Sequence, residues 1–246
     1  MIRVSDLKKA FGRKVVLDGI TFSLEKGESL VVIGGSGSGK SVLLKCLLGL
    51  VSADHGAVEI AGLSNPEPHQ MAAHLGMLFQ GGALFDSLPV WQNVAFRLQR
   101  GPDRLSKAQA RALATEKLAR VGLGPEVGDL FPAELSGGMQ KRVGLARAIA
   151  GDPPVLFIDE PTAGLDPIMA AVINALIREI VTEMGATAIT ITHDMRTLRD
   201  VADRVAMLHE GRFYWQGSAE AALSTDDPVM QQFTQGRSTG PIPTLR

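Results

Sequence analysis

Residues 34–41 read Gly34-Gly35-Ser36-Gly37-Ser38-Gly39-Lys40-Ser41 and stand between a β-branched run, Ser29 to Ile33, and a helical stretch, Lys40 to Leu50. A glycine-rich loop between a strand and a helix brings backbone N–H groups and the positive end of the helix to one point, where they bind phosphate. We expect Lys40 to reach the β- and γ-phosphates of a nucleotide and Ser41 to ligate Mg²⁺. The stretch therefore predicts a nucleotide-binding α/β fold.

The bulk composition is that of an ordinary globular protein. The chain has 246 residues, 45% of them hydrophobic and 21% charged, and a chain of this size buries enough surface to need no disulfide or metal. A net charge of −1 provides no broad attraction to nucleic acid, which is therefore not an expected partner. The single cysteine, Cys46, lies among leucines and is expected to be a core residue in a reducing compartment.

The chain shows no pattern expected of a membrane-inserted protein. Its start lacks the apolar core of a signal peptide, and no stretch approaches the ~20 apolar residues that span a bilayer. If the protein serves a membrane process, we expect other chains to do the crossing.

Periodicity around the loop predicts three kinds of structure within a single domain, 1–246. The first thirty residues alternate apolar and polar positions, as antiparallel strands do. Between about 75 and 150 a helical subdomain is expected, because Ser106 and Gln109 form a capping box. The face that follows comprises Ala110, Leu113, Ala114, Leu118 and Val121, and it ends at Gly122 and Gly124.

Strands and helices then alternate along the chain. Val155 to Ile158 is expected to be a buried strand, Pro167 to Met184 a helix with Asp166 as its N-cap, and Thr187 to Thr192 another strand. This alternation predicts a mainly parallel sheet, with functional residues at the carboxyl ends of its strands. A C-terminal tail from about 225 to 246 completes the chain.

Two adjacent acids follow the apolar strand at 155–158. Asp159 is suited to hold Mg²⁺ through water, and Glu160 to polarise an attacking water; a positioned base contributes ~10²–10⁴-fold to a rate. The alternative is a pair of solvated acids at a strand end.

Three further side chains are candidates for the same site. His193 follows a strand and is expected to contact the γ-phosphate near Glu160, the alternative being a structural histidine. Gln80 precedes two glycines and is expected to touch Mg²⁺ and the attacking water, unless it is an ordinary loop residue. Phe11 is expected to stack on adenine, with core packing as its alternative.

A second glycine element, Leu135-Ser136-Gly137-Gly138-Met139-Gln140, stands at the start of another expected helix. Such an element supplies phosphate ligands that the first loop lacks, which predicts a sandwich dimer closed by ATP.

Together these residues resemble the ATP-binding cassette (ABC) ATPases across nearly the whole chain, in family order. The resemblance implies a phosphate-loop fold with an antiparallel β subdomain and an inserted helical subdomain. It also implies a head-to-tail homodimer in which Ser136 and Gly138 of one copy bind the γ-phosphate that Lys40 of the other holds. Gly137, and Asp166 of the Gly-Leu-Asp turn, are further nucleotide-binding residues that the resemblance implies. The chain departs from the family at Phe11 and Met139, and at Ala163, which replaces a common serine.

Two segments resemble the ATPase subunits of Mla-type phospholipid transporters. The first runs from Phe79 to Phe96, where the resemblance implies docking of a membrane subunit; Leu84, Phe85, Leu88 and Trp91 are the expected exposed residues, unless they pack inside the helical subdomain. The second is the tail, Gln232-Phe233-Thr-Gln-Gly236 and then Gly240-Pro-Ile-Pro243, which in that family reaches the neighbouring ATPase. Fraying of this tail is the alternative.

The second resemblance implies an ATPase at the cytoplasmic face of a bacterial inner membrane, powering phospholipid transport between the inner and outer membranes. It implies an integral permease, a periplasmic MCE lipid-binding protein and a small cytoplasmic STAS-domain protein as partners. The alternatives are an importer ATPase for small polar solutes, a non-transport ATPase acting on ribosomes or DNA, and a scaffold without hydrolysis. The single cassette disfavours the ribosome or DNA reading, and the intact Lys40, Asp159, Glu160 and His193 disfavour the scaffold.

Overall fold

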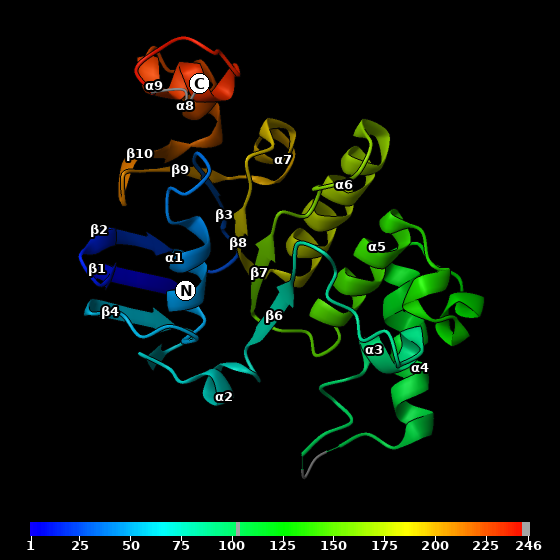
Figure 1. Ribbon diagram of the computed structural model, residues 1–246. Helices are drawn as coiled ribbons and strands as arrows, with labels where there is room; N and C mark the ends of the chain where they lie inside the picture. Colours follow the sequence, from blue (N-terminus) through cyan, green and yellow to red (C-terminus); the bar gives the residue numbers. More distant parts are fainter. Residues whose placement is uncertain (102–103, 243–246) are drawn as a thin grey trace. The chain divides into compact units, whose positions relative to one another are not determined.

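The computed structural model describes residues 1–101 and 104–242, which fall into two compact units (Figure 1). The first unit comprises Met1–Met71 together with the chain from Ile189 onward, and the second comprises Ala72–Ala188. Each unit is described separately below.

An antiparallel sheet opens the first unit. Its strands are β1 (Ile2–Phe11), β2 (Lys14–Leu24), β4 (His55–Ile60) and β5 (Leu63–Ser64), in the order β2-β1-β4-β5. They lie side by side in Figure 1, coloured blue to cyan. Ile2 and Val4 of β1 are buried, because alternate residues of a strand point to opposite faces. Leu7 is buried as well, after a register shift between Val4 and Leu7. The antiparallel prediction for this region is confirmed.

The rest of the first unit carries the phosphate loop. Strand β3 (Ser29–Ile33) is buried along its whole length and pairs in parallel with β9 (Arg204–His209), which pairs antiparallel with β10 (Arg212–Ser218). Val31, Ile33 and Met207 of this sheet belong to a core cluster of buried residues. The helices of the unit are α1 (Lys40–Leu47), α2 (Pro68–Met71), α7 (Met195–Val201), α8 (Ala219–Ser224) and α9 (Pro228–Thr234).

Helix α1 is shorter than the sequence predicts. It ends at Leu47, with Leu48 as its C-cap, rather than at Leu50. The reason is Gly49, whose φ of +68° is the left-handed conformation that ends a helix.

The second unit pairs two parallel strands and inserts helices between them. Leu75 to Leu78 of β6 (Leu75–Leu78) face Val155 to Ile158 of β7 (Val155–Asp159). The inserted elements are α3 (Val90–Val94), α4 (Lys107–Arg120), the 3₁₀ turns η1 (Pro125–Asp129) and η2 (Pro132–Glu134), and α5 (Gly137–Ala148). The predicted capping box at Ser106 and Gln109 is confirmed, with both of its hydrogen bonds present.

Helix α6 (Pro167–Met184) has the bounds and the Asp166 N-cap that the sequence predicts. β8 (Thr187–Ile191) follows it and crosses the division between the units. Among the described residues, no helix combines the length and the apolar character needed to cross a membrane.

Candidate nucleotide site

The phosphate loop needs glycine at two positions because the first unit packs closely around it. A Cβ added at Gly34 would lie 2.3 Å from the carbonyl oxygen of Leu208 in β9. At Gly39, where φ is +108°, it would lie 2.9 Å from the carbonyl oxygen of Val16 in β2. Gly37, in contrast, has open space where its Cβ would stand. The loop is thus fixed at both ends and open at its middle.

The polar groups of this loop suit a phosphate chain. The Lys40 Nζ donates to the carbonyl oxygens of Gly34 and Gly35, at 2.6 and 2.9 Å, so its ammonium lies over the loop. The Ser38 Oγ is buried and has no hydrogen-bond partner among the described residues. Ser41 is exposed in the first turn of α1. An ammonium, an orphaned hydroxyl and an open glycine backbone together fit the phosphates of a nucleotide.

A cavity of about 460 Å³ opens at the same loop. Beyond the loop, its lining includes Val15 and Val16 of β2, His209 at the end of β9, and Ile242 from the tail. These lining residues were not predicted from the sequence, because three separate stretches of the chain supply them.

Phe11, the predicted adenine partner, is 51% exposed and directly paired with Lys14, which also lines this cavity. The Lys9 ammonium lies 5.3 Å from its ring centroid. Core packing is therefore wrong for Phe11, and stacking on adenine stays a prediction.

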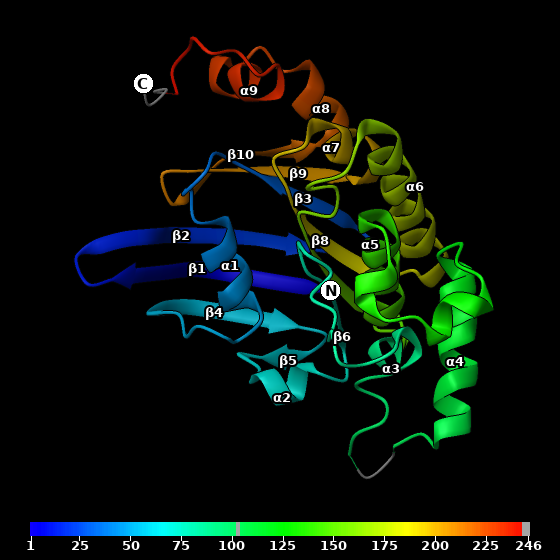
Figure 2. The same ribbon diagram turned by 45° about the vertical axis from the view of Figure 1, so that its right-hand side comes forward.

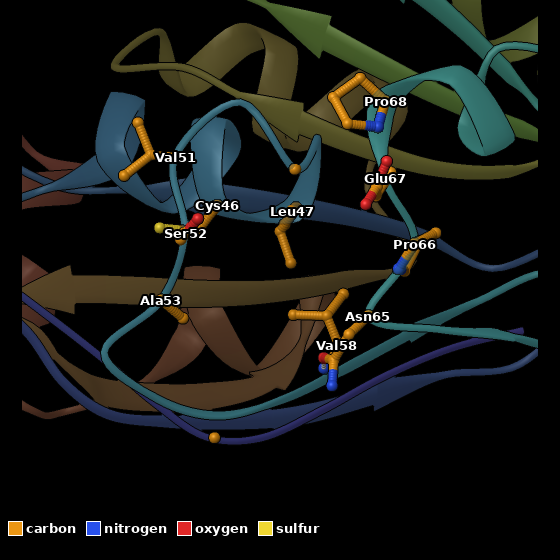
Figure 3. A pocket seen from close by; sticks show the side chains of 12 residues that line it. Cys46, Leu47, Val51, Ser52, Ala53, Val58, Asn65, Pro66, Glu67 and Pro68 are labelled. Atoms are coloured by element: carbon orange, nitrogen blue, oxygen red, sulfur yellow. Dashed lines mark hydrogen bonds between the residues drawn. The ribbon is translucent and has the colours of Figure 1, made fainter.

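Another cavity of the first unit, of about 290 Å³, is lined by none of the residues predicted for the nucleotide site (Figure 3). Cys46 and Leu47 of α1 lie on one side of it, and Asn65 and Pro66 on another. The Cys46 thiol is buried, as the sequence predicts. Burial raises its pKa, although the charge of Lys9 opposes the change.

His193 is exposed in the first unit, between β8 and α7. The preceding residue, Thr192, donates its N–H to the carbonyl oxygen of Val32, at 3.2 Å. This hydrogen bond places Thr192, the neighbour of His193, beside the end of β3, where the phosphate loop starts. The predicted contacts of His193 with the γ-phosphate and with Glu160 stay predictions.

In the second unit, one buried lysine connects two of the predicted catalytic residues. Lys141 of α5 is only 5% exposed. Its Nζ donates to the main-chain carbonyl oxygen of Gln80 and, at 3.1 Å, to that of Glu160. Burial lowers the pKa of Lys141, and the charges of Asp159 and Glu160 oppose that change. The structure thus brings the main chain of Gln80 and that of Glu160 to a single ammonium.

Sequence reasoning missed Lys141, because a lysine on a helix usually points to water. Its spacing carried a signal nonetheless. Gly144, Leu145 and Ala148 follow it at the third, fourth and seventh positions and are all buried, so Lys141 falls on the apolar face of its helix.

The second glycine element begins a helix, as predicted. Ser136 is the N-cap of α5 and accepts a hydrogen bond from the Met139 N–H, at 3.3 Å. Ser136 and Gly137 are exposed, whereas Gly138 is buried. A Cβ added at Gly138 would lie 2.7 Å from the Cε of Met169, so the start of α5 packs against the first turn of α6.

The carboxylate of Asp166 has a structural task of its own. It accepts hydrogen bonds from the N–H groups of Ile168 and Met169, at 2.9 and 3.0 Å, and so caps α6. Its predicted contact with a nucleotide is untested by this arrangement.

The predicted docking segment is wrong at one of its four residues. Trp91 is 4% exposed, because α3 packs its indole inside the helical region, with the Arg111 guanidinium 6.0 Å from the ring centroid. Leu84 and Leu88 are half-buried, and Phe85 is 42% exposed. The Phe85 ring stacks on Phe96, with centroids 4.1 Å apart.

The Asn93 side chain holds this segment in place. Its Oδ1 accepts from the Phe85 N–H at 2.7 Å, and its Nδ2 donates to the carbonyl oxygens of Phe85 and Leu88. Phe85 is therefore presented on a braced loop.

A glycine-rich phosphate loop between β3 and α1, with two acids at the end of a parallel strand, defines a phosphate-loop nucleotide-binding protein. The model of the ABC transporter family matches residues 17–163. The chain belongs to the ABC transporter family. It is the ATP-binding subunit of an ABC transporter.

Three curated relatives show how broad this likeness is. The probable ribonucleotide transport ATP-binding protein mkl of Mycobacterium tuberculosis is 40% identical over 246 residues, covering 98% of this chain and 68% of that protein. Protein TRIGALACTOSYLDIACYLGLYCEROL 3, chloroplastic, of Arabidopsis thaliana is 41% identical over 263 residues, covering 98% and 75%. The methionine import ATP-binding protein MetN of Rhizobium johnstonii is 40% identical over 222 residues, covering 88% and 60%.

Among solved structures, the ATP-binding cassette MJ0796 in a dimeric post-hydrolysis state with ADP and Pi is similar, with a TM-score of 0.79 and 27% identity. The likeness covers 89% of this chain and 99% of that one. The expected ABC cassette fold is thereby confirmed.

Proposed function

We propose that this chain is a Mg²⁺-dependent ATPase that powers phospholipid transport between two membranes of a bacterium. Two observations, one in each unit, support the ATPase part: the Lys40 ammonium lies over the phosphate loop, and the Lys141 ammonium bonds the main chain of both Gln80 and Glu160. Membership of the ABC transporter family supports ATP hydrolysis coupled to transport.

The residues divide the work of hydrolysis. The loop amides and Lys40 bind the phosphates, and Phe11 stacks on the base. Ser41, Gln80 and Asp159 hold Mg²⁺, which neutralises phosphate charge when bound. Glu160 orients and polarises the attacking water, and His193 contacts the γ-phosphate.

The site is completed by a second copy. ABC cassettes act as dimers with permease partners, and MJ0796 was solved as a dimer. Ser136 and Gly137 are exposed at the positive end of α5, where backbone N–H groups can take a phosphate. We infer that Ser136, Gly137 and Gly138, with Asp166 nearby, meet the nucleotide held by Lys40 of the other copy, head to tail.

The lipid substrate is supported by the loop and tail resemblances to Mla-type ATPases. One relative of 41% identity carries the name of a galactolipid. On this reading the chain works at the cytoplasmic face of the inner membrane, with an integral permease that Phe85 contacts, a periplasmic MCE protein and a STAS-domain protein. The second candidate is an importer ATPase for small polar solutes, favoured by the relatives named for methionine import and ribonucleotide transport.

The hydrolytic role is tested by Glu160→Gln. We expect this variant to bind ATP but to hydrolyse it about 10²- to 10⁴-fold more slowly, the contribution of a positioned base, and to accumulate as a dimer with ATP in size-exclusion chromatography. Glu183→Gln is the matched control, since Glu183 pairs with Arg120 at the far end of α6. Hydrolysis by Glu160→Gln at the parental rate would show that Glu160 is not the base.

The substrate is tested by purifying the chain with its membrane partner and identifying co-extracted molecules by mass spectrometry. Phospholipid together with an MCE protein is the expected result. Recovery of a periplasmic solute-binding protein, with neither MCE protein nor phospholipid, would favour the importer and overturn the lipid proposal.

A further inference from the structure

Helix α5 has the exposed Ser136 as its N-cap and continues into the interior of the second unit, where it meets the main chain of the proposed hydrolytic residues. Lys141 lies just over one turn from the start of α5. Its ammonium donates to carbonyl oxygens on two segments far apart in sequence, one ending β6 at Gln80 and one ending β7 at Glu160. Both acceptors are main-chain atoms, so these two hydrogen bonds do not involve the side chains of Gln80 and Glu160.

The same helix holds the Gln80 segment at two further points. The Arg147 guanidinium donates to the carbonyl oxygens of Gly82 and Ala83, at 2.6 and 2.8 Å. Between the two cations, Gly144 lies so close that an added Cβ would stand 3.3 Å from the Cα of Gly82. α5 lies beside β6 in Figure 2. The path of the chain after β6 is therefore set by α5.

The backbone at Glu160 is in need of such support. Its φ is +45°. Residues other than glycine rarely adopt this left-handed backbone conformation, and surrounding contacts must stabilise it. The Lys141 ammonium bonds the carbonyl of this strained residue. Losing that bond is expected to let the carboxylate of Glu160 change its direction.

We propose that Lys141 is a positioning residue of the ATPase reaction, fixing the main chain at Gln80 and Glu160 in register with the helix that Ser136 begins. This proposal rests on the proposed function, which assigns Gln80 to Mg²⁺ and water and Glu160 to water. The proposal gives Lys141 no contact with nucleotide or water. It acts through the direction of two other side chains, on which the rate depends steeply, since a misplacement of about 1 Å costs on the order of 10²-fold.

The test compares Lys141→Met and Lys141→Gln with Lys117→Met in the full chain. Lys117 is a matched control: it lies in the same unit, is 3% exposed, and its ammonium pairs with Asp152 at 2.7 Å rather than with the proposed site. For each variant, kcat and KM for ATP, the Kd of ATP and the thermal midpoint are measured.

We expect kcat of Lys141→Met to fall about 10- to 100-fold while the Kd of ATP stays within about threefold of the parent, since Lys40 and its loop bind the phosphates. Lys141→Gln keeps an amide donor and should lie between Lys141→Met and the parent. Lys117→Met should lower the thermal midpoint with little change in kcat. If Lys141→Met does not fold, the kcat of Lys141→Gln decides.

The proposal is overturned if the Lys141 variants match Lys117→Met in kcat at a similar loss of stability. Glu160→Gln, assayed in parallel, distinguishes a failure of the proposed ATPase function from a failure of the positioning role of Lys141. If Glu160→Gln hydrolyses ATP at the parental rate, the proposed function fails whatever Lys141 does. If Glu160→Gln is inactive but Lys141→Met is not impaired beyond Lys117→Met, only the role of Lys141 fails.

Discussion

At the scale of single residues, the conformation or burial of three residues in this protein depends on the groups packed around them. The backbone at Glu160 is left-handed, the ammonium of Lys141 is enclosed, and the thiol of Cys46 is buried beside a cavity. Only the last of these was predicted from the sequence, since burial of a cysteine among leucines follows from local pattern. The other two depend on neighbours distant in the chain.

Cys46 should show its environment in its titration. Because burial raises the thiol pKa, we expect the pH midpoint of alkylation by iodoacetamide to lie higher in the folded protein than in urea. The same shift makes stability depend on pH. The buried Cys46 thiol contributes fully to the free energy of unfolding below the unfolded thiol pKa of about 8.5, and this contribution is lost as pH rises through the higher pKa of the folded protein. An alkylation midpoint in the folded protein at or below that in urea would contradict this prediction.

At the scale of elements, the second unit shows how much of a helix is readable from sequence and how much is not. The bounds of α6 agree with the sequence prediction, which has Asp166 and Pro167 as strong local signals for the start of the helix. The buried position of Trp91 is not, because α3 is only five residues long and too short to display a face. Likewise, the contacts of α5 with the segment after β6 arise from packing between segments that are more than sixty positions apart.

Gly76 tests the close packing of α5 on β6. A Cβ at this position would lie 2.1 Å from the main-chain carbonyl oxygen of Ala148, and backbone cannot turn aside as a side chain can. We expect Gly76→Ala to destabilise the protein by about 1–3 kcal/mol, the usual cost of overpacking, measured by urea denaturation.

Gly81→Ala is the matched control for Gly76→Ala, because nothing lies within 4 Å of the Cβ it would add. Its free energy of unfolding should stay within about 0.5 kcal/mol of the parent. Equal stability of the two variants would mean that α5 does not press on β6 at Gly76.

At the scale of the whole molecule, the sequence predicts the class of fold better than it predicts which residues line the cavity at the phosphate loop. Motifs such as residues 34–41 are contiguous, so their spacing alone identifies them. The cavity at that loop draws on β2, the end of β9 and the tail, and no local pattern joins these segments. Association of this chain with a second copy and with membrane partners also stays a prediction, because no local pattern in the sequence shows which surfaces meet.

The tail offers a last consequence. Within the described residues it returns to its own unit: Gln232 of α9 donates to the Ile242 carbonyl at 2.9 Å and accepts from the Ile242 N–H at 2.6 Å. Pro243 lies outside the described residues. If two copies exchanged tails, each glutamine amide would regain the same pair of hydrogen bonds from its neighbour. The hydrogen-bond enthalpy would then be nearly the same whether each tail binds its own chain or the two chains exchange tails. The length of the connecting segment and the local concentration of the second copy would decide between these two arrangements.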